Sequence, residues 1–142
     1  MKQTDSTHPH VRGWGCYLCT LAYMAGVRDI AIVDKLFPLR IKDVAIRDND
    51  IPAEKGRDWW RCFILRPEYV VEAFARELGH DVAARELSCH ATNPEPSRIQ
   101  PGMYVVKDTG SHFGLIWPEV YNPDPTIPLS GVGKSYRVWS VV

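Results

Sequence analysis

The sequence has no excess of charge of either sign and no long hydrophobic run. Its 17 basic residues balance 17 acidic ones, so it lacks the basic surface that attracts nucleic acid or an anionic membrane. A run of about 18 apolar residues, which a membrane-spanning helix requires, is also missing. We therefore expect no nucleic-acid partner and no membrane partner.

The start of the chain lacks the apolar stretch of a secretory signal peptide, because its first ten residues read MKQTDSTHPH. We therefore expect a cytoplasmic protein whose cysteines are thiols, not disulfides. Repeats, low-complexity tracts and linkers between domains are lacking as well. The 142 residues predict one domain over 1–142, with residues 1–12 as a polar lead-in.

The expected elements are helices first and strands afterwards. The spacing of apolar residues predicts helices over 14–26, 28–37, 39–48 and 67–78. Strands are expected over 82–87, 102–107, 112–117 and 136–142, with a loop over 88–99 and a proline-rich connection over 118–134. This order predicts an α+β fold with a small, mostly antiparallel sheet.

Two cysteines lie three residues apart in the stretch RGWGCYLCTLAYMAG, and several interpretations are open. A thioredoxin-like redox pair needs a preceding strand, whereas only polar residues precede Cys16. A zinc site needs two further ligands, and Cys89 and His90 offer them without the usual spacing. In a buried helix both thiols are small apolar groups, which we prefer for Cys19.

Cys16 differs from Cys19 because it directly follows Gly15, where the helix is expected to begin. A thiol at a helix N-terminus lies near free N–H groups and the positive end of the helix dipole, and both lower its pKa. The same N–H groups can hold an oxyanion. Cys16 is therefore a candidate nucleophile, which requires a histidine at a later strand and an Asn or Asp beyond it.

His112 is the histidine with this context, because it follows the turn DTGS and opens the strand HFGLIW. It is the candidate general base, although a strand-end histidine can also be a surface residue without function. The other histidines lack this context. His8 and His10 lie in the polar lead-in and are expected to be solvated, His80 follows a helix, and His90 lies in a loop.

The segment VYNPDP follows that strand and contains Asn122 and Asp124. After a strand and a turn, either side chain can return alongside His112 and fix the tautomer of its ring. Asn-Pro and Asp-Pro also favour turns without any function. We prefer Asn122 because it directly follows an apolar pair.

Together these segments resemble the papain-like cysteine peptidase superfamily, and within it the bacteriocin-processing (double-glycine) peptidases. GCYLCTLAYMAG is similar to the nucleophile helix of that group, HFGLI to its histidine strand and YNP to its Asp-Pro segment. RCFILRPEYVVEAFARELG and GKSYRVWSV resemble an uncharacterised phage and prophage family placed near it. The resemblance implies a papain-like fold and the site residues Cys16, His112 and Asn122. Asp124 is kept as the alternative to Asn122.

The resemblance also implies an activity, namely cleavage of a peptide or isopeptide amide by a cysteine peptidase or amidase without a cofactor or metal. Trp59, Trp60 and Trp117 then line a cleft for a peptide or protein substrate, including a peptidoglycan peptide. The alternatives are a catalytically degenerate papain-like domain of phage or prophage origin that binds a peptide or host protein, and an α+β domain in which the motifs are coincidental.

The chain departs from the family pattern at two places. Tyr17-Leu18 stands where Gly-Pro is usual. The superfamily places a glutamine a few residues before the cysteine as an oxyanion donor, whereas the nearest one here is Gln3. His10 and Arg12 are the substitutes for this donor that the sequence offers.

Overall fold

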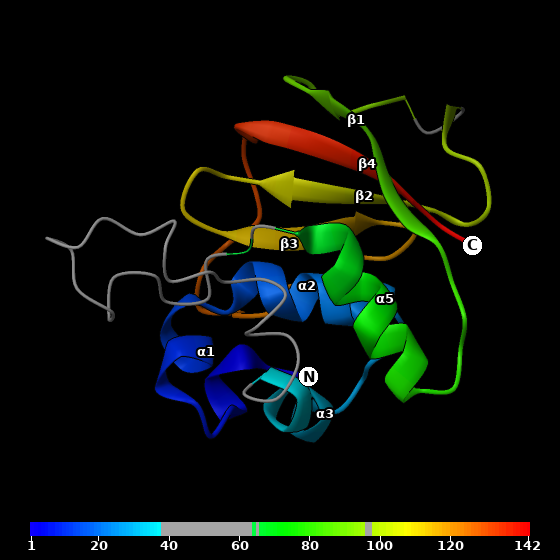
Figure 1. Ribbon diagram of the computed structural model, residues 1–142. Coiled ribbons are helices and arrows are strands. Elements are labelled where there is room, and N and C mark those ends of the chain that lie inside the picture. Colours follow the sequence, from blue (N-terminus) through cyan, green and yellow to red (C-terminus); the bar gives the residue numbers. More distant parts are fainter. Residues whose placement is uncertain (38–63, 65, 96–97) are drawn as a thin grey trace, which may run out of the picture.

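The computed structural model describes residues 1–37, 64, 66–95 and 98–142; the expected helix over 39–48 lies outside them. The described residues form helices packed on one face of a four-stranded antiparallel sheet (Figure 1). The helical elements are η1 (Gln3–Asp5), α1 (Pro9–Trp14), α2 (Cys16–Met24), α3 (Ile30–Leu36) and α5 (Pro67–Glu77). The strands are β1 (Ala84–His90), β2 (Met103–Asp108), β3 (Phe113–Trp117) and β4 (Ser135–Val141). The predicted α+β class is confirmed.

The strand order is β1-β4-β2-β3, so the last strand of the chain lies inside the sheet and β3 forms one edge. His112 directly precedes β3 and therefore lies at a sheet edge, as the sequence predicted. β1 continues beyond the predicted 82–87, because β4 provides pairing partners as far as His90 opposite Tyr136. The expectation that His90 lies in a loop is wrong.

The helix α2 is buried on most sides, as predicted. Its buried residues are Leu18, Cys19, Thr20, Leu21, Ala22 and Met24. It packs against α1, α5 and β3, which leaves little of its surface for solvent. It ends before Gly26, whose φ of 106° lies in the left-handed region that favours glycine.

Residues 1–12 are not the plain polar lead-in that the sequence suggested. They form η1 and most of α1, and Val11 is fully buried. The polar residues find partners inside the fold, since the Ser6 hydroxyl donates to the Asp34 carboxylate of α3. Hydrogen bonds as well as apolar packing hold this segment, so its polar composition did not indicate that it belongs to the fold.

The expectation that His8 and His10 are solvated is also wrong, because both are half-buried. A ring nitrogen of His8 lies 3.1 Å from the backbone oxygen of Asp34. The ring of His8 also lies 5.5 Å from that of Phe37, between centroids. These contacts hold the start of α1 against α3.

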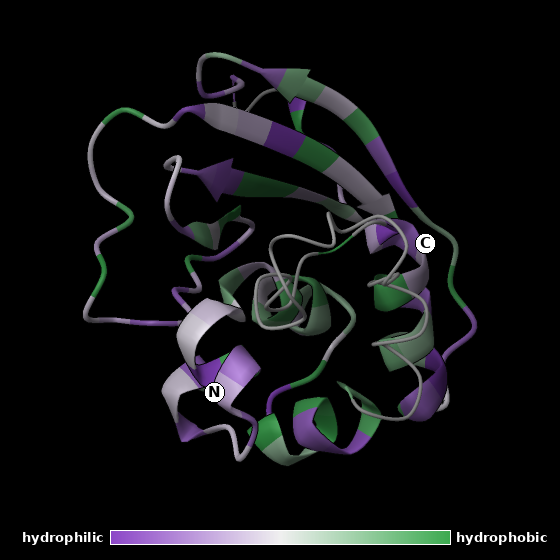
Figure 2. Cartoon of the chain, turned by 60° about the vertical axis from the view of Figure 1, so that its left-hand side comes forward, coloured by the Kyte–Doolittle hydropathy of each residue, from purple (hydrophilic) through white to green (hydrophobic). Residues whose placement is uncertain are grey.

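The sheet presents different residues on its two faces because strand side chains alternate. Figure 2 shows hydrophobic and hydrophilic residues along the strands. Val106, Leu115 and Trp139 belong to the main core with the helices. A smaller cluster of Val105, Tyr136 and Val138 lies apart from that core. We call the helix-covered side the inner face and the side with the smaller cluster the outer face.

Within the described part of the chain, every helix is too short or too polar to cross a membrane.

Candidate active site

Cys16 is the first residue of α2, as the sequence predicted, and Gly15 separates this helix from α1. A Cβ atom at Gly15 would lie 2.5 Å from the carbonyl oxygen of Val11, so no side chain fits there. Among the described residues, no backbone carbonyl accepts a hydrogen bond from the N–H of Cys16. That N–H is one of the donors at the start of a helix that no backbone carbonyl satisfies, and it is placed to bind an anionic oxygen.

The Cys16 thiol is half-buried and lies at the start of β3. Burial raises its pKa, and the charge of Asp108 acts in the same direction. Hydrogen bonds from the backbone N–H groups of Phe113, Tyr17 and Cys16 itself act in the opposite direction and are outweighed. The lowered thiol pKa expected from the sequence is therefore wrong, because desolvation exceeds the effect of the helix terminus.

His112 is almost fully buried, and its Nε2 lies 2.7 Å from Oδ1 of Asn122. The orientation of the Asn122 amide follows from its other bond, because Nδ2 donates to the backbone oxygen of Ile127 at 2.7 Å. The amide oxygen thus faces the ring, and Nε2 carries the proton in neutral His112. Nδ1 is left as the unprotonated nitrogen, which is the form that a general base needs.

Asn122 reaches His112 because the chain doubles back after β3. Tyr121 and Leu115 form an antiparallel bridge with two N–H···O bonds of 2.9 Å each. The N-terminal segment fixes this return, since the N–H of Gln3 donates to the oxygen of Pro123 at 2.9 Å. The turn that the sequence indicated between His112 and Asn122 is thus present.

Asp124 forms a turn and does not contact His112 through any hydrogen bond between described residues. Its Oδ1 accepts bonds from the backbone N–H and the hydroxyl of Thr126, at 3.1 and 2.6 Å. Its own N–H donates to Oδ1 of Asn122 at 3.2 Å. Of the two candidates, Asn122 is the one that lies next to the ring.

A stacked pair of aromatic rings connects the start of α2 to the start of β3. The rings of Tyr17 and Phe113 lie 4.3 Å apart with an interplanar angle of 12°. The Arg137 guanidinium lies 5.6 and 5.2 Å from the two ring centroids, and one of its nitrogens donates to the Tyr17 hydroxyl at 3.4 Å. Burial raises the pKa of Tyr17 to about 12. Since Tyr17 follows Cys16 and Phe113 follows His112, this stack fixes the two candidate residues relative to each other.

Sequence reasoning missed the stack and saw Tyr17 only as a departure from the family pattern. The sequence feature that could have predicted the stack is that an aromatic residue directly follows both Cys16 and His112. Arg137, on β4, gave no signal, because a charged residue in a strand is ordinary. It is held by carboxylates at 3.7 Å on either side, Asp108 and Glu86.

Gln3 is buried and lies near the end of α1, although it is far from Cys16 in sequence. Its Nε2 donates to the backbone oxygen of Arg12 at 3.1 Å, and its Oε1 has no partner among the described residues. The Arg12 guanidinium donates to the backbone oxygen of Ser6 at 3.0 Å. Both side chains thus hold the helix that leads to Cys16.

The remaining cysteines do not join this site. Cys19 is fully buried, as expected for a packing residue, and Cys89 is exposed on β1. Cys16, Cys19 and Cys89 are all free thiols, whereas Cys62 lies outside the described residues. Within the described ranges, no group of three or more His, Cys, Asp or Glu side chains is placed to hold a metal ion.

Of the three tryptophans expected to line a cleft, the structure describes Trp117. It ends β3 and is 37% exposed, which leaves part of its ring on the surface. Trp59 and Trp60 lie outside the described residues.

Comparison of the chain with models of protein families, with curated proteins and with solved structures found no match.

Proposed function

We propose that this chain is a papain-like cysteine peptidase or amidase, with Cys16 as nucleophile, His112 as general base and Asn122 as the residue that orients it. One observation carries this proposal. The backbone N–H of Phe113 lies close enough to the Cys16 thiol to act on its pKa, and His112, which directly precedes Phe113, is held by Asn122 so that its Nδ1 is free. The proposal thus draws its thiol, its base and its orienting amide from three separate segments of the chain.

In the proposed reaction, Sγ of Cys16 attacks the carbonyl carbon of an amide while its proton passes to His112. The backbone N–H of Cys16, which no backbone carbonyl satisfies, binds the oxyanion that forms. His112 then gives the proton to the leaving nitrogen as the C–N bond breaks, which leaves a thioester on Cys16. A water molecule hydrolyses the thioester, with His112 again accepting a proton.

The raised thiol pKa determines when the proton moves in this scheme. Because burial favours the neutral thiol of Cys16, proton transfer to His112 accompanies the attack instead of preceding it. The Asn122 oxygen stabilises the imidazolium that results, since Nε2–H donates to it. The substrate class that fits is a peptide or isopeptide amide, including a peptidoglycan peptide.

A second candidate function is a catalytically inactive papain-like domain that binds a peptide or a host protein. The observations that favour it are the almost complete burial of His112 and the raised pKa of Cys16. A neutral, half-buried thiol beside an enclosed ring fits a domain that has kept the fold and lost turnover. The two candidates differ in whether substitution of Cys16 abolishes a chemical reaction.

The experiment that separates them is a hydrolysis screen of the full chain against fluorogenic peptide libraries and peptidoglycan fragments. Cys16→Ala is the test variant, and Cys89→Ala is the matched control because Cys89 is an exposed thiol on β1. We expect hydrolysis by the wild type and by Cys89→Ala and none by Cys16→Ala. Trapping of a Cys16 thioester by mass spectrometry provides a second readout.

Hydrolysis that persists in Cys16→Ala would refute the assigned nucleophile. Absence of hydrolysis throughout both libraries, together with retention of a bound peptide by Cys16→Ala, would establish the binding function in its place.

A further inference from the structure

A pocket of about 390 Å³ lies on the outer face of the sheet, away from Cys16. Val138 lines this pocket and belongs to the smaller cluster on the outer face. Its neighbours on β4 point to the inner face. Arg137 contacts Tyr17, and Trp139 lies in the main core. The complete lining is Leu87, Ser88, His90, Thr92, Asn93, Pro94, Glu95, Arg98, Ile99, Met103 and Val138. Its volume is within the usual range for sites that bind small molecules.

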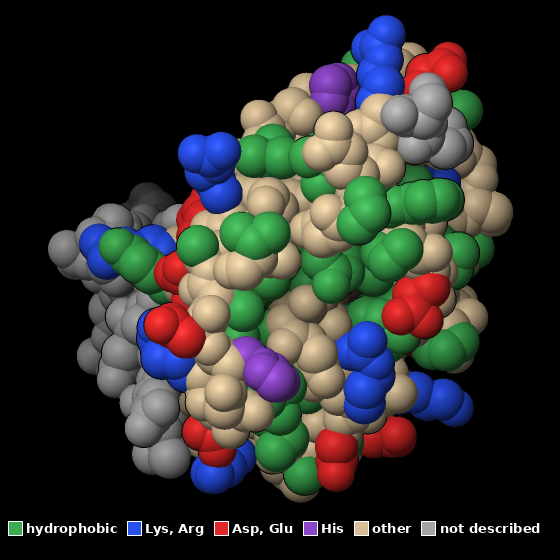
Figure 3. All heavy atoms as spheres, turned by 90° about the vertical axis from the view of Figure 1, so that its right-hand side faces the viewer, with side chains coloured by type: hydrophobic (Ala, Val, Ile, Leu, Met, Phe, Trp, Pro, Cys, Tyr) green, Lys and Arg blue, Asp and Glu red, His purple; other side chains and the backbone are tan. Residues whose placement is uncertain are grey.

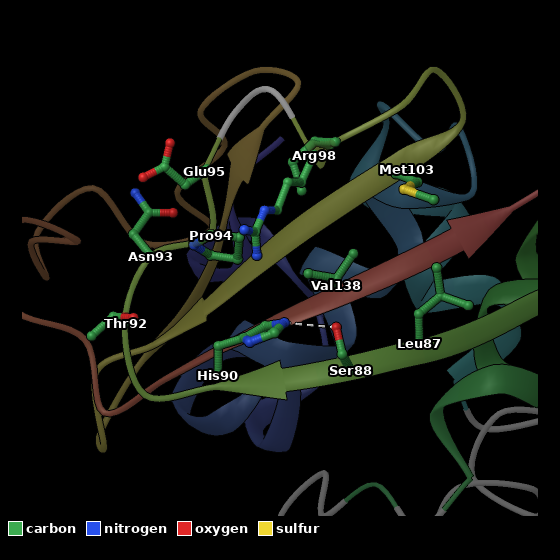
Figure 4. A pocket seen from close by; sticks show the side chains of 11 residues that line it. Leu87, Ser88, His90, Thr92, Asn93, Pro94, Glu95, Arg98, Met103 and Val138 are labelled. Atoms are coloured by element: carbon green, nitrogen blue, oxygen red, sulfur yellow. Dashed lines mark hydrogen bonds between the residues drawn. The ribbon is translucent and has the colours of Figure 1, made fainter.

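The pocket has an apolar end and a polar end (Figure 4). Leu87 and Met103 lie together at one end, and Val138 forms the floor beside them. Asn93 and Glu95 lie at the opposite end, beyond Pro94. A ligand that fills the pocket therefore needs an apolar group and a polar group a few bonds apart.

The polar groups at the centre are positioned to bind an anion. The Arg98 side chain extends over the pocket toward His90 and Val138 (Figure 4). Among the described residues, its guanidinium has no hydrogen bond or ion pair. His90 and Ser88 lie on the same side of β1, with 2.8 Å between Nε2 and the hydroxyl oxygen. An unpaired guanidinium above a histidine and a hydroxyl matches a carboxylate, which accepts two or more hydrogen bonds.

The surrounding surface supports a ligand of mixed character. On the side of the molecule that carries β1 and the C-terminus, hydrophobic side chains gather between charged ones (Figure 3). Leu87 is 37% exposed at the apolar end of the pocket, so a ligand can cover it. Burial of apolar surface there adds to the binding of the carboxylate at Arg98.

We propose that this pocket binds a small apolar carboxylate, the chemistry shared by a free aliphatic amino acid and by the C-terminal residue of a peptide. The carboxylate lies on Arg98, with His90 and Ser88 as further partners. The aliphatic group packs between Leu87 and Met103. This site is separate from Cys16 and does not depend on the proposed hydrolysis.

The test is a titration of the full ¹⁵N-labelled chain followed by backbone amide shifts. The probes are N-acetyl-L-leucine, L-leucine and L-leucinamide, of which only the last lacks a carboxylate. We expect saturable shifts of pocket residues with at least one carboxylate and none with leucinamide. Arg98→Gln should weaken binding by about tenfold or more, the effect of a lost charged hydrogen bond.

Arg85→Gln is the matched control, because Arg85 is an exposed arginine on β1 outside the pocket. Cys16→Ala provides a second control, and both variants should bind like the wild type. Tighter binding of L-leucine identifies a free amino acid as the natural ligand, and tighter binding of N-acetyl-L-leucine identifies a peptide end. The proposal is overturned by equal binding of leucinamide, by unchanged binding in Arg98→Gln, or by absence of saturable shifts in the pocket.

Discussion

The candidate active site on the inner face and the pocket on the outer face differ in how their polar side chains are partnered. At the candidate active site, three polar side chains are held from other segments: His112 by Asn122, Asn122 by the Ile127 carbonyl, and Arg137 by two carboxylates. On the outer face Ser88 and His90 bond to each other, and within the described residues Arg98 has no partner. The candidate active site therefore has its geometry before any ligand arrives, whereas the pocket on the outer face has an exposed guanidinium that is available to a ligand.

This difference predicts how substitutions act. A change on the inner face removes a group on which others depend, so its effect reaches the neighbouring residues. A change at Arg98 removes a side chain that has no partner among the described residues, so we expect little effect on the fold.

The largest effect is expected for His112→Ala, measured on a substrate from the hydrolysis screen. Loss of a general base lowers the rate by about 10² to 10⁴-fold. His90→Ala, on the outer face, is the control and should hydrolyse that substrate like the wild type. An equal loss of hydrolysis rate in both variants would contradict the assignment of His112 as the general base.

Gly15→Ala is expected to destabilise the chain by about 1–3 kcal/mol, the range for an overpacked site. The added Cβ would lie 2.5 Å from the backbone oxygen of Val11, so the backbone between α1 and α2 must move. Gly13→Ala in α1 is the control, because its Cβ would meet nothing within 4 Å. Urea unfolding of the two variants measures the difference, and a similar midpoint in both would contradict the packing argument.

The third prediction concerns pH. Burial raises the pKa of Cys16, so at neutral pH iodoacetamide should modify it more slowly than it modifies glutathione, and the rate should rise only at a more alkaline pH. The neutral thiol favours the folded state, so this contribution to stability is complete below the ordinary thiol pKa. It is lost as the pH rises through the folded-state value. Asp108→Asn removes a charge that raises the pKa and should move the alkylation profile toward lower pH; an unchanged profile would contradict this assignment.

The smallest effect is expected for Arg98→Gln on the free energy of unfolding. Because the Arg98 guanidinium has no partner among the described residues, the change should lie within about 0.5 kcal/mol. Arg137→Gln loses two ion pairs and its contacts with two rings, and should cost about 1 kcal/mol. Thermal unfolding of both variants tests the order, and a larger loss for Arg98→Gln would reverse the comparison.

The sequence predicted the parts of the site that depend on local pattern. Gly15 before an apolar helix placed Cys16 at a helix start, and a turn before HFGLIW placed His112 at a strand edge. The return of Asn122 needs only a short strand and a turn, which ten residues can supply. In each of these cases, neighbours along the chain determine the geometry.

The parts that the sequence did not predict depend on contacts between distant segments. Burial raises the pKa of Cys16, and the position of Cys16 at a helix N-terminus does not reveal how deeply the thiol is buried. The stack of Tyr17 on Phe113 requires α2 and β3 to be packed together already. Gln3 is too far from Cys16 in sequence for local pattern to predict where it lies relative to Cys16. Its amide donates to the backbone oxygen of Arg12 because residues 1–12 fold back.

The proximity of the Cys16 thiol to the backbone N–H of Phe113 links α2 to β3, which lies far along the chain. Contacts between residues so far apart in sequence form slowly, because closing the long loop between them costs entropy. The alkylation rate of Cys16 can therefore be used to follow folding. In a refolding experiment with pulsed alkylation, the slow reaction of native Cys16 should be established only when β3 docks on α2, so the thiol reports the completion of the fold without any added label.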